Sequence, residues 1–379
     1  MNEPRRRVVV AMSGGVDSSV AAAMLAAGSD EVVGVTLCLR PPECTAPARS
    51  CCGTDDLEMA RRVADRLGIP HYLIDARDEF EARVLRPAWA EYSAGRTPHP
   101  CVLCNQELKF GRLLAHARSL GADAVATGPH ARIEPEGEGG APVLRRGRDR
   151  RKDQSYFLFA LAAEQLRAAR TPIGGMTKDE VRARAAELGL PNAARPGSRD
   201  ACLAARDGSF AEALRELFGG PLRPGRIVDV EGRVLGEHRG CHRFTVGQRH
   251  RLGVALGRRA YVVEIRPERD EVVVGGFGDL ECDGVVAKGV RWLVEPPHGP
   301  LRVLAQTRYR MPVVESEVRP AEGQGAEVLF ARRAAGVAPG QAVVFYEGDR
   351  VLGGGWIERR LGGSPSTVPE QRSLTDRGP

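Results

Sequence analysis

The sequence predicts an α/β domain with a parallel sheet in the first half of the chain and a mainly β second half. Short apolar runs alternate with amphipathic stretches as far as Leu188, which is typical of parallel strands joined by crossover helices. Beyond about Pro221, Gly and Pro separate short β-branched runs, at a spacing typical of small barrels or sandwiches. At roughly 150 residues per domain, 379 residues indicate two or three domains.

Apolar runs and helical periodicity locate the elements of the first half. Strands are expected at residues 8–12, 31–39, 71–74 and 122–127. Helices are expected at residues 18–27, 55–67, 80–92, 107–118 and 178–188, because apolar side chains recur there at helical spacing. The polar, glycine-rich stretch 134–140 indicates a hairpin tip or a loop.

In the second half, β-branched runs predict strands at residues 227–230, 261–265, 271–274, 313–318 and 342–346. Residues 362–379 are rich in Gly, Ser, Pro and charge, so this tail is expected to be disordered. No internal repeat is evident.

Composition excludes several classes of protein. Hydrophobic residues make up 42% and charged residues 27%, which is ordinary globular usage. No apolar run approaches the roughly 18 residues that a membrane span needs, so no membrane is expected as a partner. The basic amino terminus is followed by an apolar run that is too short for a signal peptide. The cytoplasm is therefore the expected location.

Basic charge is concentrated in one segment. The net charge of +6 is too small to demand a polyanionic partner but permits one where the charge is local. Residues 145–152 contain Arg145, Arg146, Arg148, Arg150, Arg151 and Lys152. Such a run indicates either a solvated loop or a nucleic-acid contact.

A phosphate-binding loop is predicted between the first strand and the first helix. Ser13-Gly14-Gly15-Val16-Asp17-Ser18 places backbone N–H groups and the positive end of a helix where an anion can sit. The glycines let the backbone approach phosphate oxygens closely. The segment has neither the Gly-Lys-Ser/Thr ending of a Walker loop nor the Gly-x-Gly-x-x-Gly pattern of a dinucleotide fold.

The nine cysteines indicate metal or thiol chemistry, because their number is odd and no export signal favours a disulfide framework. Cys101 and Cys104 have the spacing of a metal knuckle or a redox pair. A four-cysteine zinc site with Cys51 and Cys52 is a weaker interpretation, because adjacent cysteines do not readily reach one tetrahedral ion.

Two resemblances link these features. The glycine loop is similar to that of the ATP pyrophosphatases, in which it grips the pyrophosphate of ATP and the α-phosphorus is attacked by a substrate oxygen. The blocks of this chain, in order, resemble those of the tRNA-specific 2-thiouridylases, which place sulfur at position 2 of the wobble uridine of tRNA. They are residues 95–110, 152–158, 245–249, 307–310, 339–341 and 352–355. The resemblance extends over residues 7–361.

The resemblance implies an adenine-nucleotide α-hydrolase-like fold with a parallel sheet and flanking helices, a small central domain and a C-terminal β-barrel. The implied catalytic domain covers residues 1–205. The central and barrel domains, both expected to bind tRNA, cover residues 206–284 and 285–361, and the tail follows at 362–379.

The resemblance also assigns the chemistry. Cys104 matches the family's first catalytic cysteine, and Cys202 matches the one that carries a persulfide received from a sulfur-donor protein. That sulfur, or hydrosulfide released when Cys104 attacks the persulfide, would replace an adenylated uracil oxygen. A carbonyl oxygen leaves poorly until it is phosphorylated, and thiolates and persulfides are strong nucleophiles near neutral pH.

The remaining assignments follow by position. ATP binding is implied for Ala11, Met12, Ser13, Gly14, Gly15, Val16, Asp17, Ser18, Leu37 and Gly128, with Asp17 helping to hold Mg²⁺. The target base is expected beside His99, Pro100 and Cys101. The implied tRNA contacts are Lys152, Asp153, Gln154, Arg308, Tyr309 and Gln341, although Tyr309 judged alone could be a core aromatic. A monomer is favoured.

Three segments depart from the family pattern. Gly128-Pro129-His130 stands where Gly-His-Tyr is usual, so that a histidine is shifted by one position. His99-Pro100-Cys101 replaces Asn-Pro-Asp or Asn-Pro-Cys, and the residues around Cys202 differ at Gly197 and Leu203.

Three alternatives stay open. Cys101, Cys104 and Cys202 could instead hold a [4Fe-4S] cluster with one iron free for sulfide. The chain could be another adenylating synthetase of the same superfamily. It could also be a non-catalytic tRNA-binding paralogue.

Overall fold

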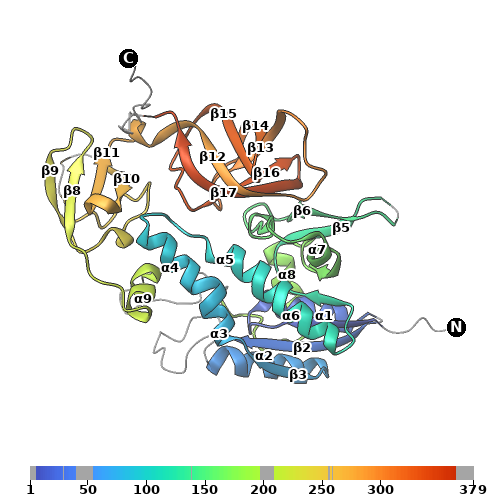
Figure 1. The fold of residues 1–379 in the computed structure, drawn as a ribbon. Coiled ribbons are helices and arrows are strands. Elements are labelled where there is room, and N and C mark those ends of the chain that lie inside the picture. Colours follow the sequence, from blue (N-terminus) through green and yellow to red (C-terminus); the bar gives the residue numbers. More distant parts are fainter. Residues whose placement is uncertain are drawn as a thin grey trace, which may run out of the picture.

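The computed structural model describes residues 6–28, 30–39, 54–137, 139–196, 209–254, 257 and 259–363. An α/β domain, a small β domain and a β-barrel follow one another along the chain (Figure 1). This is the predicted fold class. The expected tail is outside the described residues from position 364 onward.

The first sheet has the strand order β3-β2-β1-β4-β7, and its paired strands are parallel. Its strands are β1 (Arg7–Ala11), β2 (Glu31–Cys38), β3 (His71–Asp75), β4 (Ala124–Ala126) and β7 (Ala169–Arg170). Val8 and Val10 of β1 face one layer of helices, and Val9 faces the other, because side chains alternate along a strand. The sheet is therefore covered on both faces, as its continuous apolar strands predict.

One face packs against α1 (Val16–Ala26), α2 (Thr54–Leu67) and α8 (Lys178–Glu187). The expected helices at 18–27, 55–67 and 178–188 are thus confirmed within two residues at each end. α8 begins with Thr177, whose hydroxyl accepts the Glu180 N–H while the Glu180 carboxylate accepts the Thr177 N–H. This reciprocal cap fixes the start of the helix.

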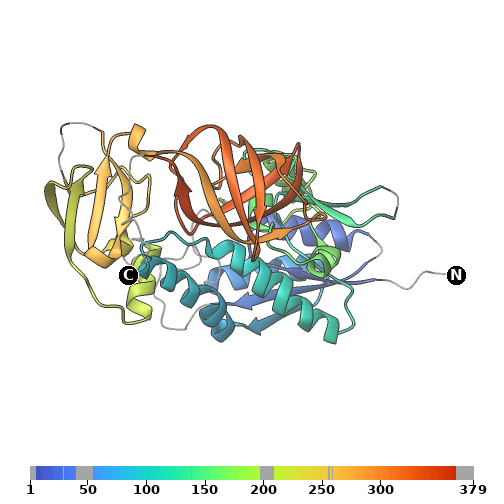
Figure 2. The ribbon, with the colours of Figure 1, turned by 45° about the horizontal axis from the view of Figure 1, so that its top comes forward.

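The other face packs against two helical segments that contain π-helical turns. The first is α3 (Arg77–Phe80), η1 (Glu81–Leu85) and α4 (Arg86–Ser93), and the second is α5 (Pro100–Leu103), η2 (Cys104–Arg112) and α6 (Leu113–Ser119). The expected start of the second helix at Glu107 was wrong. The helix begins at Pro100, whose fixed φ suits a first helical position, and so continues through Cys104. Figure 2 shows the two helical segments beside the strands of the sheet.

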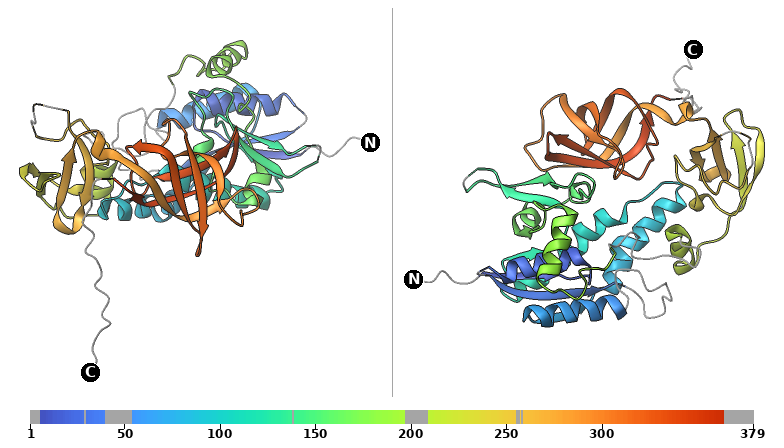
Figure 3. Two further views of the ribbon diagram at one scale, coloured as in Figure 1. Left: turned by 90° about the horizontal axis from the view of Figure 1, so that it is seen from above. Right: turned by 180° about the vertical axis from the view of Figure 1, so that it is seen from behind.

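The hairpin of β5 (Ala131–Pro135) and β6 (Pro142–Arg146) belongs to the first half of the chain but extends the sheet of the barrel. Arg145 of β6 pairs with Arg350 of β17. Glycine-rich residues between the two strands form the tip, as expected. The two views of Figure 3 show this hairpin beside the barrel. Besides α8, the segment between this hairpin and the central domain contains short helical elements. They are the 3₁₀ turn Ser155–Phe157, α7 (Ala163–Ala168) and α9 (Phe210–Leu217).

The central domain is a sheet of order β10-β11-β8-β9. Its elements are β8 (Gly225–Asp229), β9 (Val234–His238), η4 (Cys241–Arg243), β10 (Tyr261–Arg266), η5 (Pro267–Arg269) and β11 (Glu271–Gly275). Ile227, Val262 and Val272 are buried in its core.

The C-terminal sheet closes into a barrel, because β12 pairs with both β15 and β17. Its strands are β12 (Glu281–Trp292), β13 (Leu301–Gln306), β14 (Val314–Ala321), β15 (Gly325–Ala335), β16 (Ala342–Glu347) and β17 (Arg350–Leu361). Closure removes open sheet edges. In the described part of the chain, no helix is long and apolar enough to cross a membrane.

Candidate active site

The predicted phosphate loop lies between β1 and α1 and has a backbone that only glycine accommodates. Gly14 has φ +71°, and a Cβ there would lie 2.4 Å from the Asp56 carbonyl oxygen. Ser18 Oγ donates to Gly15 O at 3.0 Å and accepts from Ser13 N at 3.2 Å. These bonds fold the loop over the first turn of α1, whose N–H groups are available to an anion.

Two side chains from the segment that follows α8 bind the backbone of the loop. Asn192 is 1% exposed, and its Nδ2 donates to Gly14 O at 2.9 Å and to Ser19 Oγ at 2.8 Å. Arg195 pairs with Asp56 at 2.6 Å and lies 3.5 Å from Gly14 O. With its carbonyl bound on this side, the Gly14 peptide is fixed in orientation. Sequence analysis missed both residues, because an isolated Asn and an isolated Arg form no recognisable motif.

Asp17 lies in the first turn of α1 between two basic side chains. Lys178 Nζ, which is nearly buried, lies 2.5 Å from its Oδ1, and His130 Nε2 lies 3.6 Å from the same atom. Burial acts to raise the pKa of Asp17, but contact with His130 and the charge of Lys178 outweigh it. The pKa of Asp17 is therefore below its ordinary value, and the carboxylate is ionised at neutral pH.

Gly128 and His130 close the other side of the loop. A Cβ on Gly128 would lie 2.5 Å from the Asp17 carbonyl carbon, so no side chain fits there. The His130 backbone exchanges two hydrogen bonds with Gln154, at 3.1 and 2.9 Å. Its ring is 2% exposed, and neither ring nitrogen has a hydrogen-bond partner within the described ranges. The shifted histidine thus still reaches Asp17 and keeps unused hydrogen-bonding capacity beside the loop.

The loop's neighbours at the sheet edge are Ala11, Met12 and Leu37. Met12 N donates to Val35 O at 2.8 Å, which fixes the end of β1 against β2. Leu37 is buried near the carboxyl end of β2. In an open parallel sheet, ligands bind at this edge.

Cys104 is buried in the same apolar cluster as Leu37 and Leu39. It lies at the start of the π-helical turns, one turn after Pro100, whereas Cys101 is exposed. The first candidate thiol is thus part of the apolar core on the face of the sheet to which Val9 points. Cys202, Gly197 and Leu203 are outside the described residues, as are Cys51 and Cys52.

His99 caps α5 and lies among aromatic rings. Its ring centroid is 5.5 Å from that of Tyr156 and 5.0 Å from that of Phe157. Burial, together with the charge of Arg308, lowers the pKa of His99 to about 4, so its ring is neutral at physiological pH. Its Nδ1 is buried and has no partner in the described part of the structure.

The residues expected to contact tRNA fall into two groups. Lys152, Gln154, Arg308 and Tyr309 are partly exposed, and Tyr309 packs on Phe157 with ring centroids 4.4 Å apart. Asp153 and Gln341 are instead 7% and 6% exposed. Asp153 accepts from the backbone N–H groups of Gly147 and Ser155, both at 3.0 Å, and from Arg146 Nε at 2.8 Å.

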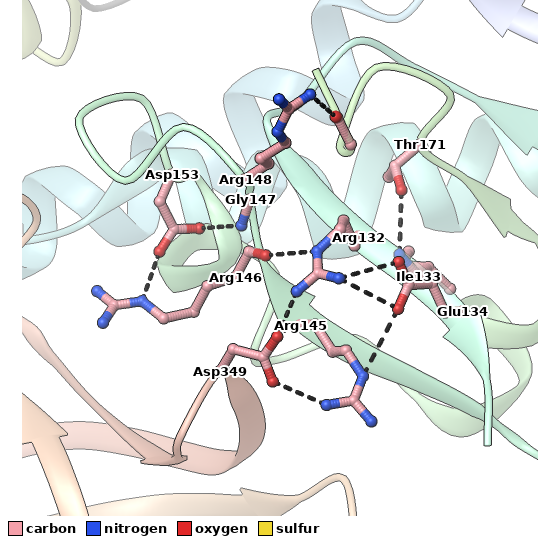
Figure 4. Close-up of polar contacts among 11 residues, drawn as sticks. Arg132, Ile133, Glu134, Arg145, Arg146, Gly147, Arg148, Asp153, Thr171 and Asp349 are labelled. Atoms are coloured by element: carbon pink, nitrogen blue, oxygen red, sulfur yellow. Dashed lines mark hydrogen bonds and ion pairs between the residues drawn. The ribbon is translucent and has the colours of Figure 1, made fainter. Parts of the chain in front are cut away.

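Much of the basic segment 145–152 is paired with carboxylates (Figure 4). Arg145 lies 2.8 Å from Asp349, which also pairs with Arg132. Arg146 binds Asp153, and Arg148 lies 3.0 Å from Glu180. Arg150 and Arg151 remain exposed. The segment is therefore a structural ion-pair network with an exposed basic end, and its contact with nucleic acid stays a prediction.

Metal ligation has limited support. Among the described residues, no three His, Cys, Asp or Glu side chains are grouped so as to hold a metal ion. Mg²⁺ commonly takes only one or two protein carboxylates and completes its shell with phosphates and water. Asp17, with its side chain 32% exposed, fits that limited role.

Comparisons with known proteins agree along the whole chain. The family model described as the tRNA methyl transferase HUP domain matches residues 6–206. The models of the corresponding PRC-barrel domain and of the aminomethyltransferase β-barrel domain match residues 219–276 and 282–357.

Curated relatives cover almost the full length. The tRNA-specific 2-thiouridylase MnmA of Geotalea uraniireducens is 45% identical over 365 residues, covering 95% of this chain and 97% of the relative. The enzyme of the same name from Rhodospirillum centenum is 47% identical over 363 residues, covering 93% and 92%. The chain therefore belongs to the tRNA-specific 2-thiouridylase family.

Proposed function

We propose that the protein is an ATP-dependent sulfurtransferase that thiolates position 2 of the wobble uridine of tRNA. The uracil C2 oxygen attacks the α-phosphorus of ATP and releases pyrophosphate. Sulfur then attacks C2, and the former carbonyl oxygen departs with AMP. The relatives named tRNA-specific 2-thiouridylase support this reaction, and the reaction would take place in the cytoplasm.

The observation that carries the proposal is that a phosphate-binding loop and a buried thiol belong to one α/β domain. The loop after β1 offers N–H groups to phosphate, and Cys104 is buried in the apolar cluster that contains Val9 of β1 and Leu37 of β2. Adenylation makes the oxygen a good leaving group, and a nearby thiol or persulfide supplies the nucleophile. An adenylating synthetase that forms an amide or an amidine would have no need of the thiol.

ATP would lie along the loop from Ser13 to Ser18. Its phosphates would accept the N–H groups at the start of α1, and Gly128 would leave room for close backbone approach. Ala11, Met12 and Leu37 would line the nucleoside side of the site. Mg²⁺ bound with the nucleotide would offset phosphate charge, and Asp17 is the carboxylate offered to it. The ring of His130 is a second group with hydrogen-bonding capacity at the same place.

Sulfur would arrive as a persulfide on Cys202, supplied by a donor protein. If the terminal sulfur attacks C2 directly, AMP leaves and the base stays joined to Cys202 by an S–S bond. Attack of Cys104 on the Cys202 sulfur then frees the thiolated base and forms a Cys104–Cys202 disulfide. If Cys104 attacks the persulfide instead, hydrosulfide is released and a Cys104–Cys202 disulfide forms. A dithiol reductant must then return two electrons to regenerate both thiols. In either route AMP is the leaving group.

The base and the tRNA would approach from the barrel side of Cys104. His99, Pro100 and Cys101 border the segment that leads to the thiol, and a neutral His99 suits contact with an uncharged base. Lys152, Arg308 and Tyr309 offer charge and a ring to the RNA. The domains would correspond to residues 1–205, 206–284 and 285–361, acting as a monomer.

The experiment combines ATP, Mg²⁺, a persulfide donor and unmodified tRNA, followed by mass spectrometry for 2-thiouridine. The intact protein is expected to form it. Cys202→Ser should abolish product while tRNA-dependent ATP consumption partly persists, because adenylation precedes sulfur transfer. Undiminished thiolation by that variant would overturn the persulfide assignment.

Two controls separate the alternatives. Full turnover by Cys104→Ser would indicate an adenylating synthetase of another kind, and absence of tRNA-dependent pyrophosphate release would indicate a non-catalytic tRNA-binding protein. Anaerobic purification with iron and acid-labile sulfide analysis tests the [4Fe-4S] alternative. An iron-free, active enzyme would exclude the cluster.

A further inference from the structure

The barrel binds the segment that leads into the Cys104 helix. Thr97 N donates to Pro339 O at 2.8 Å, and Gln341 Nε2 donates to Thr97 O at 3.0 Å and to Pro98 O at 3.2 Å. Thr97 is 8% exposed. These bonds join residues more than 240 positions apart in the chain. The barrel thus fixes the backbone at Thr97 and Pro98, two to three residues before Pro100.

The barrel residues that make this contact are themselves hydrogen-bonded to strand β17. Gly340 N donates to Ile357 O, and Ile357 N donates to Gln341 O, both at 2.8 Å, so that strand β17 pins residues 340 and 341. Gly340 has φ +87°, and a Cβ there would lie 2.9 Å from Thr97 O. Only glycine allows such close approach of the two backbones.

A second contact reinforces the first beside His99. Tyr156 OH donates to Ala342 O at 2.8 Å, and the ring of Tyr156 contacts that of His99. Residues 339–342 therefore hold both the backbone before His99 and the ring against which His99 packs. Pro100 follows at once, and Cys104 lies one helical turn further on.

From these contacts we infer that Gln341 positions the Cys104 helix rather than contacting tRNA; the inference rests on the thiolation reaction proposed above. Both hydrogens of its amide are used on backbone carbonyls, and the side chain is only 6% exposed. A group so engaged has little surface to offer to RNA. Its effect on the reaction is transmitted through Thr97 and Pro98 to the thiol.

The test compares Gln341→Leu with the unmodified protein in steady-state thiolation. Gln341→Leu keeps a similar volume but removes both donors. The kcat is expected to fall about 10-fold or more, because small displacements of a reacting group are costly, while KM for tRNA changes less than about twofold. Hydrogen exchange measured by mass spectrometry should become faster in the peptide spanning residues 97–104.

Gly340→Ala provides an independent variant, since it displaces the same segment and leaves every donor in place. It should lower kcat and speed exchange in the same peptide. Gln306→Leu is the matched control. Gln306 is also a buried barrel glutamine, at 4% exposure, but its Nε2 donates to Met311 O at 2.9 Å. Its replacement should leave exchange at 97–104 unchanged.

A tRNA-contact role would give the reverse pattern, with KM for tRNA raised, kcat unchanged and no altered exchange at 97–104. That result, or unaltered kcat in both Gln341→Leu and Gly340→Ala, would overturn the inference. Faster exchange at 97–104 in Gln306→Leu would also count against it. If the unmodified protein forms no 2-thiouridine, the proposed function fails instead, so the two failures are distinguishable.

Discussion

Asn192 shows how one buried side chain fixes the phosphate loop. Replacing it with Leu removes the hydrogen bonds to Gly14 O and Ser19 Oγ, so the Gly14 peptide is free to reorient. A typical hydrogen bond contributes about 1 kcal/mol, and about 1.4 kcal/mol is tenfold in affinity. We expect KM for ATP to rise about 10-fold in Asn192→Leu, measured by tRNA-dependent pyrophosphate release.

Arg182→Ala is the control for this variant, because Arg182 is exposed on the adjacent helix α8. Its KM for ATP should stay at the value of the unmodified protein. Equal ATP affinity of Asn192→Leu and Arg182→Ala would show that the loop keeps its conformation without the amide.

Asp153 is expected to act on stability. Its carboxylate accepts three hydrogen bonds within the turn that connects residues 146–155. Asp153→Asn loses the charge that pairs with Arg146 and turns an NH₂ group toward donors. The free energy of unfolding should fall by about 1–3 kcal/mol, as measured by urea denaturation. Asp123→Asn, at an exposed position, should change it by less than about 0.5 kcal/mol.

At the scale of elements, the π-helical turns of η2 place Cys104 on a rigid segment. Gly111 lies near the end of these turns, and a Cβ there would lie 2.8 Å from the Gln106 carbonyl oxygen. Because the obstacle is backbone, the turns must shift to accept Ala. We expect Gly111→Ala to lower the free energy of unfolding by about 1–3 kcal/mol and to reduce single-turnover thiolation.

Gly175→Ala is the matched glycine variant, because a Cβ there meets no atom within 4 Å. It should leave both unfolding and thiolation nearly unchanged. If Gly111→Ala behaves in the same way, the π-helical turns tolerate the methyl group and do not restrict the position of Cys104.

The helix around Cys104 also shows which helix boundaries the sequence predicts and which it does not. Long segments with a 3.6-residue period, such as 55–67 and 178–188, were placed correctly, since one apolar face defines them. The start at Pro100 was missed, because π-helical turns do not keep that period. The position of the glycine loop between β1 and α1 was confirmed, because the loop sequence and its backbone conformation are local properties.

Long-range contacts account for the other omissions. Motif position predicts a tRNA contact for Gln341 and does not reveal that this side chain is buried against Thr97, which is 244 positions away. Likewise, residues 134–140 were expected to form a hairpin tip or a loop, yet only the folded chain reveals that the strands of this hairpin extend the barrel through the pairing of β6 with β17. A short motif carries no information about which distant surface will cover it.

At the scale of the whole molecule, Glu212 lies where the α/β domain meets the central domain. It lies on α9 and binds His242 at 2.9 Å and Arg243 at 3.2 Å, both in η4, as well as Arg215 at 2.7 Å on its own helix. The Trp89 ring of α4 packs edge-on against His242, with centroids 5.7 Å apart. Three elements from two domains therefore meet around one buried carboxylate.

This cluster predicts a specific loss of stability in acid. Burial acts to raise the pKa of Glu212, but its bonds to His242, Arg215 and Arg243 outweigh burial and lower the pKa to about 2, from 4.5. A lowered pKa stabilises the folded state above pH 4.5, and this contribution is lost as the pH falls toward 2. It amounts to about 3 kcal/mol at neutral pH.

Glu212→Gln isolates this contribution from those of the other carboxylates. The variant should be less stable than the unmodified protein at neutral pH, and the difference in their free energies of unfolding should shrink as the pH is lowered from 4.5 toward 2. Urea denaturation at a series of pH values measures both curves. A difference that stays constant across this range would show that Glu212 does not carry the acid sensitivity of the contact between the two domains.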